Sequence, residues 1–290
     1  MANSMHILLR AVVAEYLEAI QGVRTENVVA NHVSMSKRFL SYFSSHRPVR
    51  DLAKLGQADL LAFLDWLTHR RGRFTAHTYN MGVEFIKRLT RFCLARNWLE
   101  EDPAAEISYQ EIKPRTPEVL TREEMARLIE GAGEDDLNRV LVGLLGEVGL
   151  KKQELVNLRF ADLELDDPNP EIVVRYTGKL KRKTRRLALP EALAAALRRY
   201  TAYRQEEGTY GFLTPLVPIT GRQVNNIIAT LCRQAGVRRA NPQMLRDSAA
   251  AHMLLAGRPP EEVGQQLGYT PRGYLLEFLP RFQVWMEPSP

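Results

Sequence analysis

Apolar residues recur every three to four positions through about the first 100 residues, with charged or polar residues between them. One-sided burial of an amphipathic helix produces this pattern. Loops are expected at 44–48, which ends in proline, and at 70–75, where Thr75 is placed to cap the next helix. We therefore predict a compact bundle of short helices over residues 11–20, 28–43, 60–67 and 79–96.

The helical pattern stops at 100–103, and the stretch 113–117 carries two prolines and two basic residues. Proline disfavours helix in the residue before it, so this composition suits an extended linker. Thr121, with Glu124 three residues later, forms the capping box that begins a new helix. The predicted domains are 1–107 and 119–290, joined by a linker over 108–118.

The second domain mixes element types. Residues 172–176 are rich in β-branched and aromatic side chains, and 185–189 are the expected partner strand, with 177–184 as the hairpin loop. The fold class is thus mainly α with a small β-sheet. Helices are expected over 122–132, 136–149, 151–158, 190–206, 220–235, 243–256 and 260–267.

Composition narrows the class of protein. The chain has 290 residues, of which 45% are hydrophobic and 26% charged, as in soluble globular proteins of two domains. Two cysteines, Cys93 and Cys232, are too few for a disulfide framework or a cysteine zinc site. The sequence contains no uninterrupted run of about 18 apolar residues, which is the length that spanning a membrane requires. We expect a reduced, cytoplasmic protein without metal or cofactor. A net charge of +6 favours a polyanionic partner modestly.

Basic residues concentrate around the predicted hairpin, where no acidic residue interrupts them. Such a run is either a solvated loop tip or a loop laid against a phosphate backbone, and charge alone leaves both interpretations open. Gly178-Lys179 at a strand end would let one lysine reach a single phosphate. The run comprises Arg175, Lys179, Lys181, Arg182, Lys183, Arg185 and Arg186.

Two further motifs suggest an anion site. In 149–155 a glycine leads a tight turn between two helices, so Lys151 either faces an anion or is an ordinary surface residue. Near the C-terminus, 241–247 places Arg246 early in a helix, and 267–269 and Phe278 follow.

In this order and spacing, the motifs resemble those of the tyrosine recombinase (phage integrase, Xer-type) family over nearly the whole chain. The resemblance implies a helical core-binding (SAM-like) DNA-binding domain followed by a catalytic-type domain, clamped around duplex DNA. It also implies a metal-free reaction, in which a tyrosine hydroxyl attacks a phosphate that two arginines hold. A histidine assists proton transfer, and a hairpin lysine protonates the leaving oxygen.

The chain departs from that pattern at most catalytic positions. Lys151 replaces the first arginine, Gln243 replaces a histidine, Tyr269 replaces His or Trp, and Phe278 replaces the nucleophile. Lys179 and Arg246 match the family, whereas Asp247 stands where histidine is common. One histidine, His252, occurs from residue 113 onward, so no shift of register supplies two active-site histidines.

These departures predict a chain that binds double-stranded DNA through Arg246 and the hairpin run but does not cut it. It would act as an architectural or regulatory factor, or as the non-cutting partner of an active recombinase. Two alternatives stay open: a divergent active recombinase that uses Tyr274 as nucleophile, and a protein-interaction module that no longer binds DNA. The family assembles as tetramers that exchange a C-terminal segment, yet only twelve residues follow Phe278.

Overall fold

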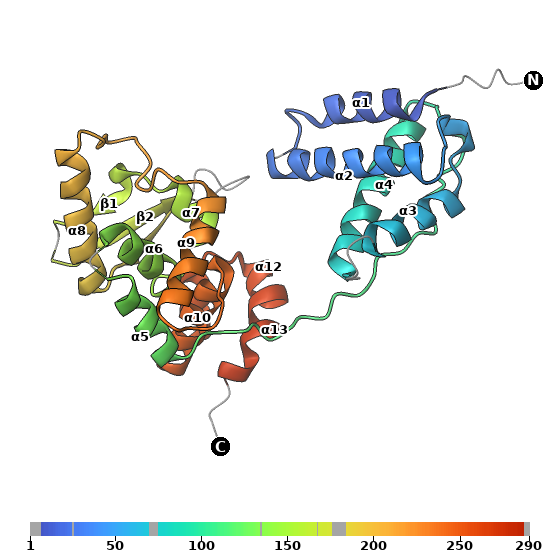
Figure 1. Ribbon diagram of the computed structural model, residues 1–290. Helices are drawn as coiled ribbons and strands as arrows, with labels where there is room; N and C mark the ends of the chain where they lie inside the picture. Colours follow the sequence, from blue (N-terminus) through green and yellow to red (C-terminus); the bar gives the residue numbers. More distant parts are fainter. Residues whose placement is uncertain are drawn as a thin grey trace, which may run out of the picture. The chain divides into compact units, whose positions relative to one another are not determined.

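The structure, a computed structural model, describes residues 7–24, 26–69, 75–133, 135–166, 168–175 and 184–286. The chain divides into two compact units, Met1–Lys113 and Pro114–Pro290, and each has its own hydrophobic core (Figure 1). Within the described ranges, no helix is long and apolar enough to cross a membrane.

The first unit is the predicted helical bundle. Its core centres on Phe39, Phe63 and Phe85, and the Phe39 ring centroid lies 5.2 Å from that of Phe63 and 5.5 Å from that of Phe85. The expected cap is confirmed, because the Thr75 hydroxyl accepts a hydrogen bond from the Thr78 amide at 3.2 Å. The helices are α1 (Leu9–Ile20), α2 (Glu26–Ser45), α3 (Gln57–His69) and α4 (Ala76–Ala95), with a 3₁₀ turn at Leu52–Lys54.

The chain leaves this unit along α4. The Asn80 side chain both donates to and accepts from the main chain of Gln110, at 2.8 Å in each case. The Tyr109 hydroxyl donates to Glu84 at 2.6 Å. Residues 109 and 110, which the sequence assigned to the linker, are therefore fastened to the bundle.

Helix α6 (Asp136–Gly146) is the central helix of the second unit, and every residue from Val140 to Gly146 is buried. It packs against α8 (Glu191–Glu206) and α10 (Pro242–Leu255). The capping box at Thr121 and Glu124 is confirmed at the start of α5. The remaining helices of this region are α5 (Arg122–Gly131), α7 (Lys152–Asn157), a 3₁₀ turn at Phe160–Asp162, α9 (Gly221–Gln234) and α11 (Pro260–Gln266).

The sheet has three antiparallel strands in the order β1 (Leu163–Glu164), β2 (Glu171–Arg175) and β3 (Thr184–Ala188). The predicted hairpin is confirmed: Ile172 pairs with Leu187, and both face the core because side chains alternate along a strand. The two-residue β1 was not expected. Residues 176–183, which include the hairpin lysines, lie outside the described residues.

The sequence predicted no element after residue 267, but the described chain continues as helix. A short α12 (Pro271–Gly273) leads into a π-helical turn (Tyr274–Phe278), then α13 (Leu279–Phe282) and a 3₁₀ turn (Gln283–Trp285). Phe278 and Phe282 are fully buried in a cluster with side chains of α10 and α11. This C-terminal segment, residues 271–286, thereby packs on the helix that carries Arg246 (Figure 1).

Candidate functional site

Gly149 sets the turn that leads into α7. Its φ of 83° lies in the left-handed region, and a Cβ there would lie 2.5 Å from Cδ2 of Leu267. Lys151 follows as the N-cap, with its amide donating to the Glu154 carboxylate at 2.9 Å. The Lys151 side chain reaches solvent, yet desolvation, followed by the charge of Arg246, lowers its pKa.

Arg246 lies on α10 and is only 2% exposed. Its guanidinium donates to the main-chain carbonyls of Gly149 and of Leu267, the latter at 2.6 Å, and lies 5.7 Å from the Tyr269 ring centroid. Burial lowers its pKa. Arg246 therefore braces the 149 turn against the 267–269 loop, and Lys151 is the more accessible cation beside it.

Arg185 is enclosed by partners within its own domain. Both of its terminal nitrogens donate to Glu154, at 3.0 and 2.9 Å, and its Nε donates to the Gln266 carbonyl at 2.8 Å. The two side chains are 8% and 6% exposed. Burial alone would raise the pKa of Glu154, but the hydrogen bonds and charge of Arg185 outweigh it and lower that pKa. Arg185 on β3 faces the domain interior, where it holds Glu154, and its contact with DNA stays a prediction.

Arg175 and Arg186 remain more than half exposed but have acidic partners. Arg175 pairs with the buried carboxylate of Asp162 at 2.8 Å, and Arg186 pairs with Glu164 and Glu171. Of the predicted DNA-binding run, Lys179, Lys181, Arg182 and Lys183 lie outside the described residues. The described members of the run are thus anchored at the base of the hairpin.

Gln243, Asp247 and Tyr269 belong to one polar network. The Gln243 amide donates to Oδ1 of Asp247 at 2.9 Å, while Arg281 of α13 donates to Oδ2 of Asp247 at 2.8 Å and to the Tyr269 hydroxyl at 3.4 Å. Burial raises the pKa of Asp247, although Arg281 and Gln243 act in the opposite direction. Gln243 and Tyr269, two of the predicted catalytic positions, are therefore joined to the C-terminal segment through Asp247 and Arg281.

Phe278 is completely buried in a column of aromatic rings. Its ring stacks on Tyr274 at 5.5 Å and on Phe282 at 4.9 Å, and it meets Tyr269 at 5.3 Å between centroids. The hydroxyl of the half-buried Tyr274 donates to Glu261 at 3.0 Å. Burial, followed by that hydrogen bond, raises the pKa of Tyr274.

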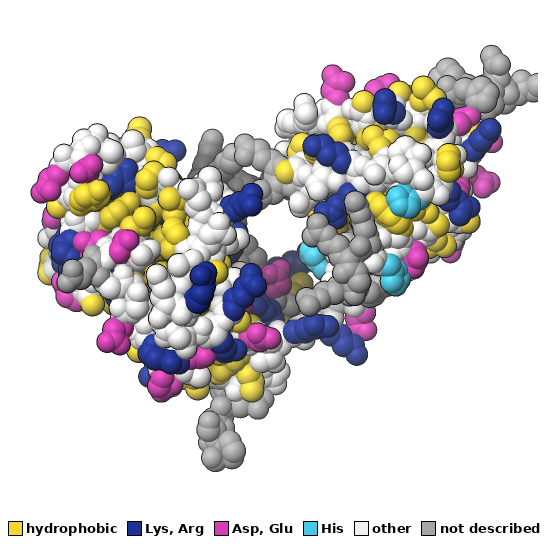
Figure 2. Space-filling view, viewed as in Figure 1, with side chains coloured by type: hydrophobic (Ala, Val, Ile, Leu, Met, Phe, Trp, Pro, Cys, Tyr) yellow, Lys and Arg dark blue, Asp and Glu magenta, His cyan; other side chains and the backbone are white. Residues whose placement is uncertain are grey.

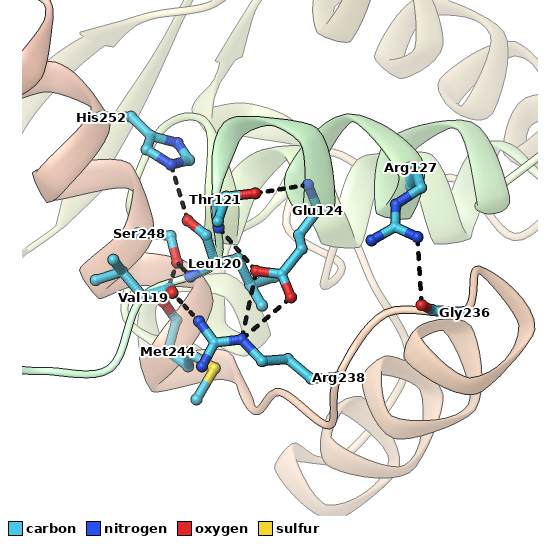
Figure 3. A network of polar contacts seen from close by, with 10 residues as sticks. All are labelled: Val119, Leu120, Thr121, Glu124, Arg127, Gly236, Arg238, Met244, Ser248 and His252. Carbon is cyan, nitrogen blue, oxygen red and sulfur yellow. Dashed lines mark hydrogen bonds and ion pairs between the residues drawn. The ribbon is translucent and has the colours of Figure 1, made fainter.

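His252 lies on α10 and holds the end of the linker (Figure 3). Its Nε2 donates to the Leu120 carbonyl at 2.9 Å, and the Leu120 amide donates to the Ser248 hydroxyl at 2.8 Å. Arg238 reaches the Val119 carbonyl and the Glu124 carboxylate from the other side. The second unit's single histidine is therefore a structural residue.

Sequence reasoning missed two groups. The first is Arg281, which lies about one helical turn after Phe278. That spacing was the available signal that both residues lie near the same face of a helix. Lys152, on the solvent side of α7, donates to Asn225 of α9 at 3.2 Å, and its side chain passes 3.3 Å from where a Cβ of Gly221 would lie. Together with the exposed Arg222, it extends the basic surface beside Lys151.

Among described residues, no cluster of potential metal ligands occurs.

The sequence is similar to those of known tyrosine recombinases over most of its length. The chain is 26% identical over 261 residues to tyrosine recombinase XerC of Roseiflexus sp. (84% of this chain, 81% of the relative). It is 29% identical over 269 residues to XerD of Mycobacterium tuberculosis (83% and 84%).

Solved structures share the fold. A lambda integrase dimer bound to a core site matches with a TM-score of 0.71 at 13% identity (98% of this chain, 78% of that chain). XerH bound to its difH substrate matches with a TM-score of 0.67 at 20% identity (85% and 76%). The model of the phage integrase family matches residues 118–272, which is more than half of the chain. The chain therefore belongs to the phage integrase family, the tyrosine recombinases.

Proposed function

We propose that this chain binds duplex DNA and leaves its strands uncut, as an architectural or regulatory factor or as the non-cutting partner of an active recombinase. The observation that carries this proposal is Phe278, which has no hydroxyl and is fully buried, and which we assign to the nucleophile position from the order of the motifs. A covalent phosphotyrosine step has no attacking group there. We place its action on DNA in the cytoplasm, alone, as a homo-oligomer or beside a partner recombinase.

The neighbouring groups support the same conclusion. Tyr274 is the nearest alternative nucleophile along the chain, but its hydroxyl is bonded to Glu261 and its raised pKa disfavours the phenolate. Gln243 cannot accept and return a proton near neutral pH. Loss of one preorganised donor to developing charge costs on the order of 10²–10³ in rate, and here several positions differ at once.

DNA binding depends on different groups, which the chain keeps. Figure 2 shows Lys and Arg side chains over both units with acidic side chains interspersed, so we expect affinity to come from cations that form no ion pair with a carboxylate. Lys151, Lys152 and Arg222 are candidates among described residues, and the hairpin lysines are proposed to join them. Their contacts with phosphate would make binding strongly dependent on salt.

The cleavage test uses duplexes selected by binding from a random-sequence pool and then nicked so that any cleavage is trapped. We expect no covalent protein–DNA adduct for the unaltered chain on a denaturing gel, and none for Tyr274→Phe. An adduct that forms with the unaltered chain and is lost in Tyr274→Phe would establish the active, divergent recombinase instead.

Binding is tested separately by fluorescence anisotropy over a range of salt concentrations. Neutralising Lys181, Arg182 and Lys183 together should lower affinity and reduce the slope of log K against log salt by roughly 2–3, since each phosphate that the protein neutralises adds about 0.9 to that slope. A charge-matched control neutralises Arg122, Arg127 and Arg199, which lie on α5 and α8, and should have a smaller effect. Absence of binding even at low salt would favour the protein-interaction module.

A further inference from the structure

The C-terminal segment, residues 271–286, is held on its own domain by both apolar and polar contacts. Phe278 and Phe282 are fully buried against α10 and α11, as in a hydrophobic core. Arg281, between them, is paired with Asp247 of α10. The apolar side chains of Phe278 and Phe282 are therefore covered, whereas Leu275, Leu276 and Val284 of the same segment are exposed.

The ion pair between Asp247 and Arg281 is largely shielded from solvent. The side chain of Asp247 is 7% exposed and that of Arg281 is 26% exposed. Both carboxylate oxygens of Asp247 are used, one by Arg281 and one by Gln243, and the second terminal nitrogen of Arg281 reaches the Tyr269 hydroxyl. A buried pair of this kind adds little net stability, but removal of one partner leaves the other charge buried without compensation. It therefore favours one placement of the segment over others.

We infer that Asp247 and Arg281 form a latch that keeps the C-terminal segment closed in cis on α10, so that this chain does not pass the segment to a neighbouring copy. The apolar cluster supplies the affinity and the latch selects the position. This inference does not depend on DNA binding or on strand cleavage, and it is tested without DNA first.

The first experiment measures amide hydrogen exchange over residues 274–286. Arg281→Gln should accelerate exchange there on the order of 10²-fold, because it removes the cation that is paired with the buried Asp247 carboxylate. The double variant Asp247→Asn/Arg281→Gln should exchange more slowly than Arg281→Gln, since the buried carboxylate is then removed together with its partner. Arg272→Gln is the matched control: it removes the same charge from an exposed position of the same segment and should leave exchange unchanged.

Circular dichroism shows whether each variant folds. If Arg281→Gln does not fold, the double variant can still be compared with the unaltered chain and with Arg272→Gln. Equal protection of the segment in Arg281→Gln and Arg272→Gln would overturn the latch. So would a double variant whose exchange matches that of Arg281→Gln.

The second experiment asks whether the segment stays in cis. A photoreactive amino acid replaces Val284, which is 58% exposed, and ¹⁴N- and ¹⁵N-labelled chains are mixed before irradiation, with and without duplex DNA. Cross-links that join peptides of one isotope only are expected under both conditions. Mixed-isotope cross-links at the frequency of random pairing would show exchange between copies and overturn the inference.

Discussion

Arg185 and Arg186 are adjacent in sequence and have the same charge, but their surroundings give them different roles. Arg185 is enclosed with Glu154 and the Gln266 carbonyl, whereas Arg186 reaches its acidic partners at the surface. Strand geometry explains the difference, because successive side chains of β3 point to opposite faces. A run of basic residues therefore contains both structural and surface members.

Arg185→Gln should destabilise the second unit by about 3–5 kcal/mol, because it leaves the Glu154 carboxylate buried without its cation. Arg186→Gln should change stability by less than about 1 kcal/mol, as exposed ion pairs do. Urea unfolding followed by circular dichroism measures both. If Arg185→Gln were no more destabilising than Arg186→Gln, the structural role assigned to Arg185 would be wrong.

At the same scale, the sequence predicts which residues occupy the family's catalytic positions but not which partners those residues contact. The residues at the family positions, such as Phe278 and Gln243, can be identified from motif order. The partner of Asp247 could not, because Arg281 is 34 residues away and pairing at that distance depends on how α13 packs. Likewise, the role of His252 depends on the linker, 132 residues earlier in the chain.

At the scale of elements, helices with regular apolar spacing were predictable to within a few residues. The C-terminal segment was not, because a π-helical turn adds a residue to each turn and so breaks the 3.6-residue pattern at Tyr274–Phe278. Strand β1 has two residues, too few to show alternation. Periodicity thus identifies long elements and misses those fixed by tertiary packing.

The turn before α7 joins two elements through one glycine. Gly149→Ala should destabilise the protein by the cost of a left-handed alanine, about 1–2 kcal/mol, and by a further 1–3 kcal/mol, roughly, for the overlap with Leu267. The overlap would also displace the carbonyl that Arg246 contacts.

Gly257→Ala is a matched control, because Gly257 has a φ of 80° but no atom within 4 Å of an added Cβ. It should show the first cost alone. The difference between the two variants in thermal unfolding then measures the contact with Leu267, and equal losses would contradict the close packing described here.

At the scale of the whole molecule, hydrogen bonds hold the chain to its own unit on either side of residues 111–118. Tyr109 and Gln110 are bound to α4 in the first unit, and Val119 to Thr121 are held by α10, Arg238 and Glu124 in the second (Figure 3). Only residues 111–118 lie between these anchors, and Pro114 and Pro117 restrict their conformations. The two units are thus tethered by a short, proline-containing chain.

Tethering should raise duplex affinity if both units contact DNA, because binding of one unit places the other at a high local concentration. The full chain is expected to bind a duplex roughly 10²–10⁴ times more tightly than either unit, 1–113 or 114–290, and an equimolar mixture of the units should not recover that affinity. Circular dichroism first establishes that each separate unit folds.

Flexible insertions after Arg115 should weaken binding gradually with length, whereas the same insertions after the exposed Gly208 should not. If one unit alone matched the full chain in anisotropy titrations, only that unit would carry the DNA contact.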